Sequence, residues 1–353
     1  MRFEALMDVL RGRLYPTLTL VAIAPAIAAK DSGDTGEDTC LRHDVACFAK
    51  GLFEDCPRGA AAARELQTDG KLEGGGAIEE GSGLDTCELQ SVDGLASSRL
   101  AECCYEVTLE CTRVVGCGCG GRPLRVERRV VRPLLIYGPR RSGPAPHTAT
   151  LDPVRRATLA AWWGGIGVSE HASVASFRRF RRSLRGLRAP PGLLDRAERA
   201  IADEARHARL AFGIAGAYAG AGMRAGPMVL GRPRAVSLEH FAAETARDGG
   251  VEELRSLVLL AAIAEEVREP AVAEVLETII QDELDHVLLA WDTVQWSMDT
   301  GGEKVREQVR RALAEPTPKP ANWPDDPVLA AHGLPRREVL VGAFLATQAL
   351  LAG

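Results

Sequence analysis

Two stretches of the chain, DEARHARLAF and DELDHVLLAW, combine acidic residues with a histidine at the same spacing. On a helix, residues three apart share a face, so Glu204 would lie beside His207, and Glu283 beside His286. Each pair would then present a carboxylate oxygen and an imidazole nitrogen together. Mixed ligands of this kind suit iron or manganese, with zinc as a further possibility.

A single glutamate precedes each acid and histidine pair at a similar interval. Glu170 lies in GVSEHASVASF and Glu253 in GGVEELRSLVLL, and each is followed three residues later by a serine, Ser173 or Ser256. Glu252 is the alternative to Glu253, although it would face about 100° away on a helix. The interval and the serine favour Glu253. The pattern indicates one structural unit that is used twice.

The helix predicted around Glu283 is apolar on more than one side, which is typical of a buried helix. Burial of an uncompensated carboxylate is costly, so Glu283 and His286 need a partner inside the protein. A bound metal ion would compensate the carboxylate. One such pair alone is common on solvated helices, but two matched pairs with matched single acids upstream favour a metal site.

Four long helical segments would position these side chains. The periodicity predicts helices over 155–186, 193–218, 237–268 and 270–298. Short turns within each pair and a long Gly- and Pro-rich middle connection predict two hairpins joined by a crossover. The fold class is therefore mainly α, with a four-helix bundle over 155–300, and 301–353 forms a Pro-rich segment with a last helix.

This arrangement resembles the ferritin-like di-iron carboxylate superfamily, in which two helices each supply a Glu and the other two each supply Glu-x-x-His. The resemblance covers about 162–298. It implies six metal ligands, namely Glu170, Glu204, His207, Glu253, Glu283 and His286. DEARH also resembles the Asp-Glu-x-Arg-His motif of oxygen-activating members, whereas DELDH places Asp285 where the arginine would stand.

The resemblance further implies that Asp203 and Asp282 each accept the free N–H of the histidine from the opposite hairpin. The cofactor would be two iron ions, with manganese or a mixed Mn/Fe pair as alternatives and zinc less suited. Such a centre would act on dioxygen or peroxide, with an unidentified small substrate and electron donor, and with no catalytic residue beyond the metal site. A ferroxidase, an iron-storage protein and a non-catalytic metal-binding or interaction scaffold remain the alternatives.

Cysteine is confined to the first third of the chain. All nine precede residue 120, at Cys40, Cys47, Cys56, Cys87, Cys103, Cys104, Cys111, Cys117 and Cys119. This density predicts a small disulfide-rich module over 30–121, held in an oxidising compartment. A zinc site is the competing interpretation, but the chain has no C-x-x-C pair. A Pro- and Gly-rich linker over 122–154 would follow.

The N-terminal 29 residues contain the apolar run LYPTLTLVAIAPAIAA, which predicts a signal peptide and a periplasmic or secreted protein. Translation could start at Met1 or at Met7. The alternative is an N-terminal helix buried in the fold. The 353-residue chain has a formal charge of −5 and a pI near 5.9, which gives no sign of nucleic-acid binding. No segment after the N-terminal run is apolar for long enough to predict a membrane span.

Overall fold

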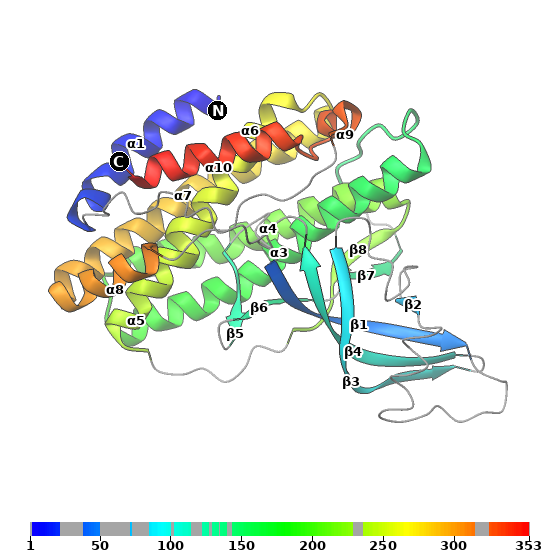
Figure 1. The fold of residues 1–353 in the computed structure, drawn as a ribbon, viewed down its shortest axis with the longest axis horizontal. Helices are drawn as coiled ribbons and strands as arrows, with labels where there is room; N and C mark the ends of the chain where they lie inside the picture. Colours follow the sequence, from blue (N-terminus) through cyan, green and yellow to red (C-terminus); the bar gives the residue numbers. More distant parts are fainter. Residues whose placement is uncertain are drawn as a thin grey trace, which may run out of the picture.

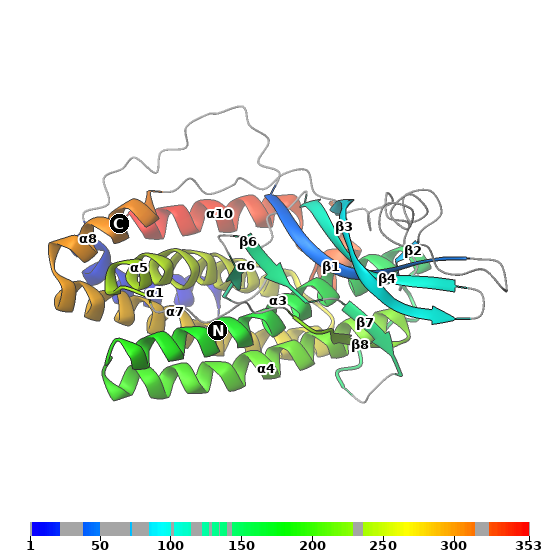
Figure 2. The same ribbon diagram turned by 90° about the horizontal axis from the view of Figure 1, so that it is seen from below.

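The computed structural model of the protein describes residues 2–21, 38–49, 71–72, 85–99, 102–113, 122–126, 129–133, 135–139, 143–228, 236–314 and 325–352. For the segments between 38 and 113, the description covers the backbone alone. Helices make up most of the described chain, and a curved sheet lies at one end of them in both views (Figures 1 and 2).

The first two long helices, α3 (Pro153–Gly186) and α4 (Pro191–Ala219), pack against each other as a hairpin. The Asp152 side chain accepts a hydrogen bond from the Arg155 backbone N–H, and Pro153 occupies the first turn, which together start α3. Gly220, at φ 70°, ends α4 in the left-handed conformation that favours glycine. Both helices match the predicted segments closely.

The third predicted helix is present but is not a regular α-helix. It consists of α5 (Leu238–Glu244), a π-helical segment, η2 (Thr245–Glu252), and α6 (Glu253–Glu266). A Cβ atom on Gly249 would lie 2.8 Å from the Ala290 Cβ, and one on Gly250 would lie 3.0 Å from Trp291. The two glycines therefore let η2 approach α7 (Pro270–Gly301), the fourth long helix, more closely than other residues could.

Four further helices of the described residues pack around this core. They are α1 (Phe3–Val21), α8 (Glu303–Leu313), α9 (Pro327–Ala331) and α10 (Arg337–Ala352). Helices α1 and α10 lie side by side and contact α6, as Figure 1 shows. The sequence predicted the last helix but not α8. Among the described residues, no helix combines the length and the hydropathy needed to cross a bilayer.

Helix α1 occupies most of the predicted signal segment, and its apolar side chains belong to the hydrophobic core. Leu6, Leu10 and Leu14 are almost fully buried and pack in the same cluster as side chains of α6 and α7. Removing the helix would expose that surface to water, which is unfavourable. The packing places α1 in the hydrophobic core, and the signal peptide and the cellular location stay predictions.

The Cys-rich region forms strands. The main sheet has the order β3 (Asp85–Arg99), β4 (Glu102–Arg113), β1 (Asp38–Ala49), β6 (Arg129–Arg132) and β5 (Arg125–Val126), with β2 (Lys71–Leu72) paired to β1. The β1–β4 register sets Cys40 opposite Cys111 and Cys47 opposite Cys104. Disulfide pairing stays a prediction, because Cys56, Cys117 and Cys119 lie outside the described residues and the strand side chains are not described.

Among the described residues, one short strand connects the main sheet to the helices, and a separate strand pair connects two segments beside them. Strand β6 pairs with β1 in parallel and also contacts α3. A separate pair, β7 (Leu135–Gly138) with β8 (Gly222–Ala225), fastens the segment before α3 to the segment after α4. Both connections lie where the sequence predicted linker or loop.

Candidate metal centre

The six predicted ligands come from four helices and lie inside the helical core. Their side chains are at most 2% exposed: Glu170 on α3, Glu204 and His207 on α4, Glu253 at the start of α6, and Glu283 and His286 on α7. Charged side chains are almost never buried this completely unless they are paired or bind a metal.

Four of these residues form a tight group that could hold a metal ion. One ligand atom from each of Glu170, Glu204, His207 and Glu283 lies within 4.8 Å of the others. The His207 Nδ1 atom is 3.2 Å from a Glu283 carboxylate oxygen and 3.7 Å from a Glu170 oxygen. The group offers three carboxylates and one imidazole, which is a suitable donor set for iron or manganese.

His286 lies next to this tight group. Its Nδ1 atom is 3.4 Å from an oxygen of Glu204 and 3.4 Å from an oxygen of Glu283. The rings of His207 and His286 have centroids 5.9 Å apart. Glu204 and Glu283 therefore each approach both histidines, which is the arrangement needed for carboxylates that would lie between two metal positions.

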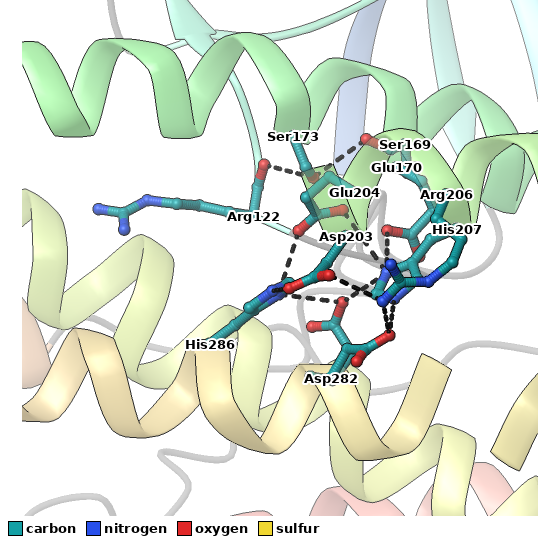
Figure 3. A network of polar contacts seen from close by, with 11 residues as sticks. Arg122, Ser169, Glu170, Ser173, Asp203, Glu204, Arg206, His207, Asp282 and His286 are labelled. Carbon is teal, nitrogen blue, oxygen red and sulfur yellow. Dashed lines mark hydrogen bonds and ion pairs between the residues drawn. The ribbon is translucent and has the colours of Figure 1, made fainter. Parts of the chain in front are cut away.

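On their outer sides, the two histidines face aspartates of the opposite hairpin, as Figure 3 shows. The His207 Nε2 atom lies 2.9 Å from the Asp282 carboxylate, which is a hydrogen bond, and the His286 Nε2 atom lies 3.5 Å from Asp203. A proton on Nε2 leaves the Nδ1 lone pair facing the carboxylate group. This is the tautomer that a metal ligand requires.

Arg206 connects the two aspartates. Its guanidinium donates to Asp203 at 2.7 Å and to Asp282 at 2.6 Å, so one cation holds the outer partners of both histidines (Figure 3). Partial burial alone would raise the pKa values of both aspartates, but the facing histidine and then Arg206 lower them. The motif DEARH contained this arginine, but its spacing alone did not reveal the bridge.

The carboxylate oxygens and the Nδ1 atoms of the six predicted ligands lack hydrogen-bond partners. Within the described residues, this holds for both carboxylate oxygens of all four glutamates and for Nδ1 of both histidines. Each unpaired buried polar group costs about 1–3 kcal/mol or more, and charged groups cost more. These unpaired atoms fit a metal site, because bound metal ions would take them as ligands.

The pKa values of these groups reflect both burial and the charges of neighbouring side chains. Burial raises the pKa of Glu204 well above its usual value, and the nearby Glu170 and Glu283 raise it further. Burial would raise the pKa of Glu283 too, but His286 and His207 together bring it down to about 2. Burial opposes the charged form of both histidines, yet carboxylate neighbours raise their pKa values well above the usual range. A metal bound here would displace these protons.

Glu253 lies outside the tight group and has a different neighbour. Burial raises its pKa to about 8, and the positive charge of Arg122 is the main influence that lowers it. Arg122 is only 4% exposed. Its carbonyl accepts a hydrogen bond of 2.9 Å from the Ser173 hydroxyl, which anchors the backbone at 122 to α3 (Figure 3). Sequence reasoning missed Arg122, because no motif connects it to residues so distant in the chain.

Other acids and histidines near the site have different surroundings. Glu252 pairs with Arg255 at 3.1 Å and is partly exposed, whereas Glu253 is fully buried. Three acids on α5 and α6 have partners of their own: Glu244 pairs with Arg179, Glu265 accepts a hydrogen bond from the Phe3 backbone N–H, and Glu266 pairs with Arg336. His171 is half-buried and His240 is exposed.

Comparison of the chain with models of known protein families, with curated proteins and with solved structures finds no match. The structure itself supports a helical protein in which a buried group of three glutamates and a histidine could hold a metal ion.

Proposed function

We propose that the protein is a ferritin-like dinuclear metal protein that reacts with dioxygen or peroxide as a di-iron oxidoreductase. The four long helical segments would form the bundle of that superfamily. Glu170, Glu204, His207, Glu253, Glu283 and His286 would hold the two ions, and manganese could replace one or both irons. When bound, a pair of ferrous ions would supply the two electrons that reduce dioxygen or peroxide.

One observation carries the proposal: carboxylates from both hairpins converge on two histidines, of which His207 is oriented by a hydrogen bond to Asp282 and His286 faces Asp203. Oriented Nδ1 atoms are what a metal site needs before the metal arrives. In this site the protein's own residues would bind the ions, exclude water and fix the histidine tautomers.

Oxygen consumption tests the proposal. The protein loaded anaerobically with Fe(II) should consume dissolved oxygen faster than the same Fe(II) in buffer, and Glu204→Ala should reduce that rate to the buffer level. Glu252→Ala is the matched control, because Glu252 is an acid beside the site that pairs with Arg255 instead. An Fe(II)-loaded protein that reacts with neither oxygen nor peroxide would contradict the proposal.

A non-catalytic metal-binding scaffold is the second candidate, and one observation favours it. The four residues of the tight group are all 0% exposed, so solvent does not reach their ligand atoms. Structural metal sites are closed in this way, whereas catalytic sites keep a position for substrate. In that case, metal removal would lower the melting temperature, and the loaded protein would show no oxygen reaction.

A further inference from the structure

Arg122 lies in the protein interior between α3 and the π-helical segment. Its guanidinium carbon is 4.2 Å from the centre of the Phe180 ring and 5.6 Å from that of Phe177. On the other side, a Cβ atom on Gly249 would come within 3.1 Å of Nη1. The bare glycine backbone thus makes room for the guanidinium, and the aromatic rings stabilise its charge through cation–π contacts.

One nitrogen of this buried guanidinium has no partner. Nη1 of Arg122 makes no hydrogen bond to any residue that the structure describes. The buried acid next to Gly249, Asp248, does not supply one, because its carboxylate accepts hydrogen bonds from Arg125 at 2.9 Å and Arg247 at 3.0 Å. An unpaired buried donor on a charged group is costly, so its presence suggests a missing acceptor.

A second unpaired donor lies on the same stretch of η2. The Thr245 side chain is 0% exposed, and its hydroxyl has no hydrogen-bond partner in the described part of the chain. Thr245, Gly249 and Glu253 are spaced four residues apart, so they follow one face of the helical segment. In order along the chain, this face therefore carries the Thr245 hydroxyl, the glycine beside the Arg122 guanidinium and the buried Glu253 carboxylate.

Metal binding would change the charges around Arg122. Among the described residues, no carboxylate forms an ion pair with Arg122. Two divalent ions would balance the four negative charges of Glu170, Glu204, Glu253 and Glu283. Glu253 would then be committed to the metal site, and Arg122 would be a buried cation without a counter-ion, which is unfavourable by several kcal/mol.

We propose that Arg122 binds the acid group of a small organic carboxylate beside the metal centre. The planar guanidinium suits a carboxylate, and the Thr245 hydroxyl would be a second donor to it. The inference rests on the proposed dinuclear site and narrows the unidentified substrate to small carboxylic acids. It also gives the segment before β5 a role in substrate recognition.

Calorimetric titration of the Mn(II)-loaded protein with butyrate and with butyramide tests this inference. The two molecules have nearly the same shape, but only butyrate is charged. Butyrate should bind and butyramide should bind at least ten-fold more weakly. Arg122→Gln should lower butyrate affinity by about ten- to a hundred-fold, as expected for the loss of a charged hydrogen bond. Arg122→Lys keeps the charge but loses the planar pair of donors, so it should weaken butyrate binding by less than Arg122→Gln does. Arg178→Gln, at an exposed position on α3, should change nothing.

Metal content and melting temperature are measured on the same samples, so the two proposals fail differently. A protein that binds no metal would contradict both. A protein with two metal ions per chain that binds no butyrate, or binds it equally well after Arg122→Gln, would overturn the role of Arg122 and leave the metal centre intact. If Arg122→Gln fails to fold, Arg122→Lys and the butyrate to butyramide comparison on the unaltered protein still decide the question.

Discussion

The two helical halves of the protein carry the same pattern of acids and histidines, yet they present it differently. In the first half, α3 is a regular helix and Glu170 belongs to the tight group that could hold a metal ion. In the second half, the corresponding Glu253 follows a π-helical segment and lies outside that group, in the electric field of Arg122. A π-helical segment beside a candidate site is common where function requires a departure from regular geometry.

The contacts between the two histidines and the facing aspartates also differ between the two halves. His207 forms a 2.9 Å hydrogen bond with Asp282, whereas His286 lies 3.5 Å from Asp203, which exceeds a normal hydrogen-bond length. The proposed metal position at His207 would therefore be organised in advance, and the proposed one at His286 would be looser. An internal repeat can place the same residues in two halves and still give them unequal surroundings.

The largest expected effect is a contrast between two glutamates. Glu204 approaches both histidines, so Glu204→Ala should abolish binding at both positions, whereas Glu253→Ala should affect one. A ligand at 100 times its Kd stabilises a protein by about 2.7 kcal/mol. A saturating amount of Mn(II) should therefore raise the melting temperature of the unaltered protein by roughly 3–5 °C for each occupied position.

Thermal melting with and without Mn(II) measures this contrast. Glu204→Ala should show no metal-dependent shift, and Glu253→Ala should keep about half of the shift seen in the unaltered protein. Equal losses in the two variants would show that the halves contribute alike, against the asymmetry described above.

A smaller difference is expected between the two aspartates. Loss of an outer hydrogen bond to a ligand histidine commonly lowers metal affinity about 10–100-fold. Asp282→Asn should show a loss of that size, because Asp282 bonds directly to His207, and Asp203→Asn should lose less than about ten-fold. Competition with a coloured chelator gives both affinities. A greater loss in Asp203→Asn than in Asp282→Asn would reverse the assignment of the better organised position.

The helical part of the fold could be predicted from sequence because its signals are local. Asp152 before Pro153, Gly220 after α4 and Pro270 at the start of α7 are all residues that begin or end helices for reasons of backbone chemistry. The π-helical turn at Gly249 could not be predicted in the same way. It depends on the close approach of η2 to α7, which is a tertiary effect.

In the candidate site, too, some features follow from local sequence and others depend on tertiary packing. The spacing within each acid and histidine pair is a helical property, so sequence alone could bring Glu204 to His207 and Glu283 to His286. Arg122 and the Arg206 bridge depend on how separate segments pack, and no local spacing reports that. The burial of Leu10 on α1 is also a tertiary fact, whereas an apolar N-terminal run by itself equally predicts a signal peptide.

Metal content per chain, determined by plasma mass spectrometry on untagged protein purified without added metal, is the measurement that decides between a metal centre and a metal-free fold. The geometry around His207 and His286 predicts close to two iron or manganese ions per chain. It also predicts their loss when Glu204→Ala and Glu283→Ala are combined. No bound metal, or a single ion that survives both substitutions, would contradict the dinuclear centre.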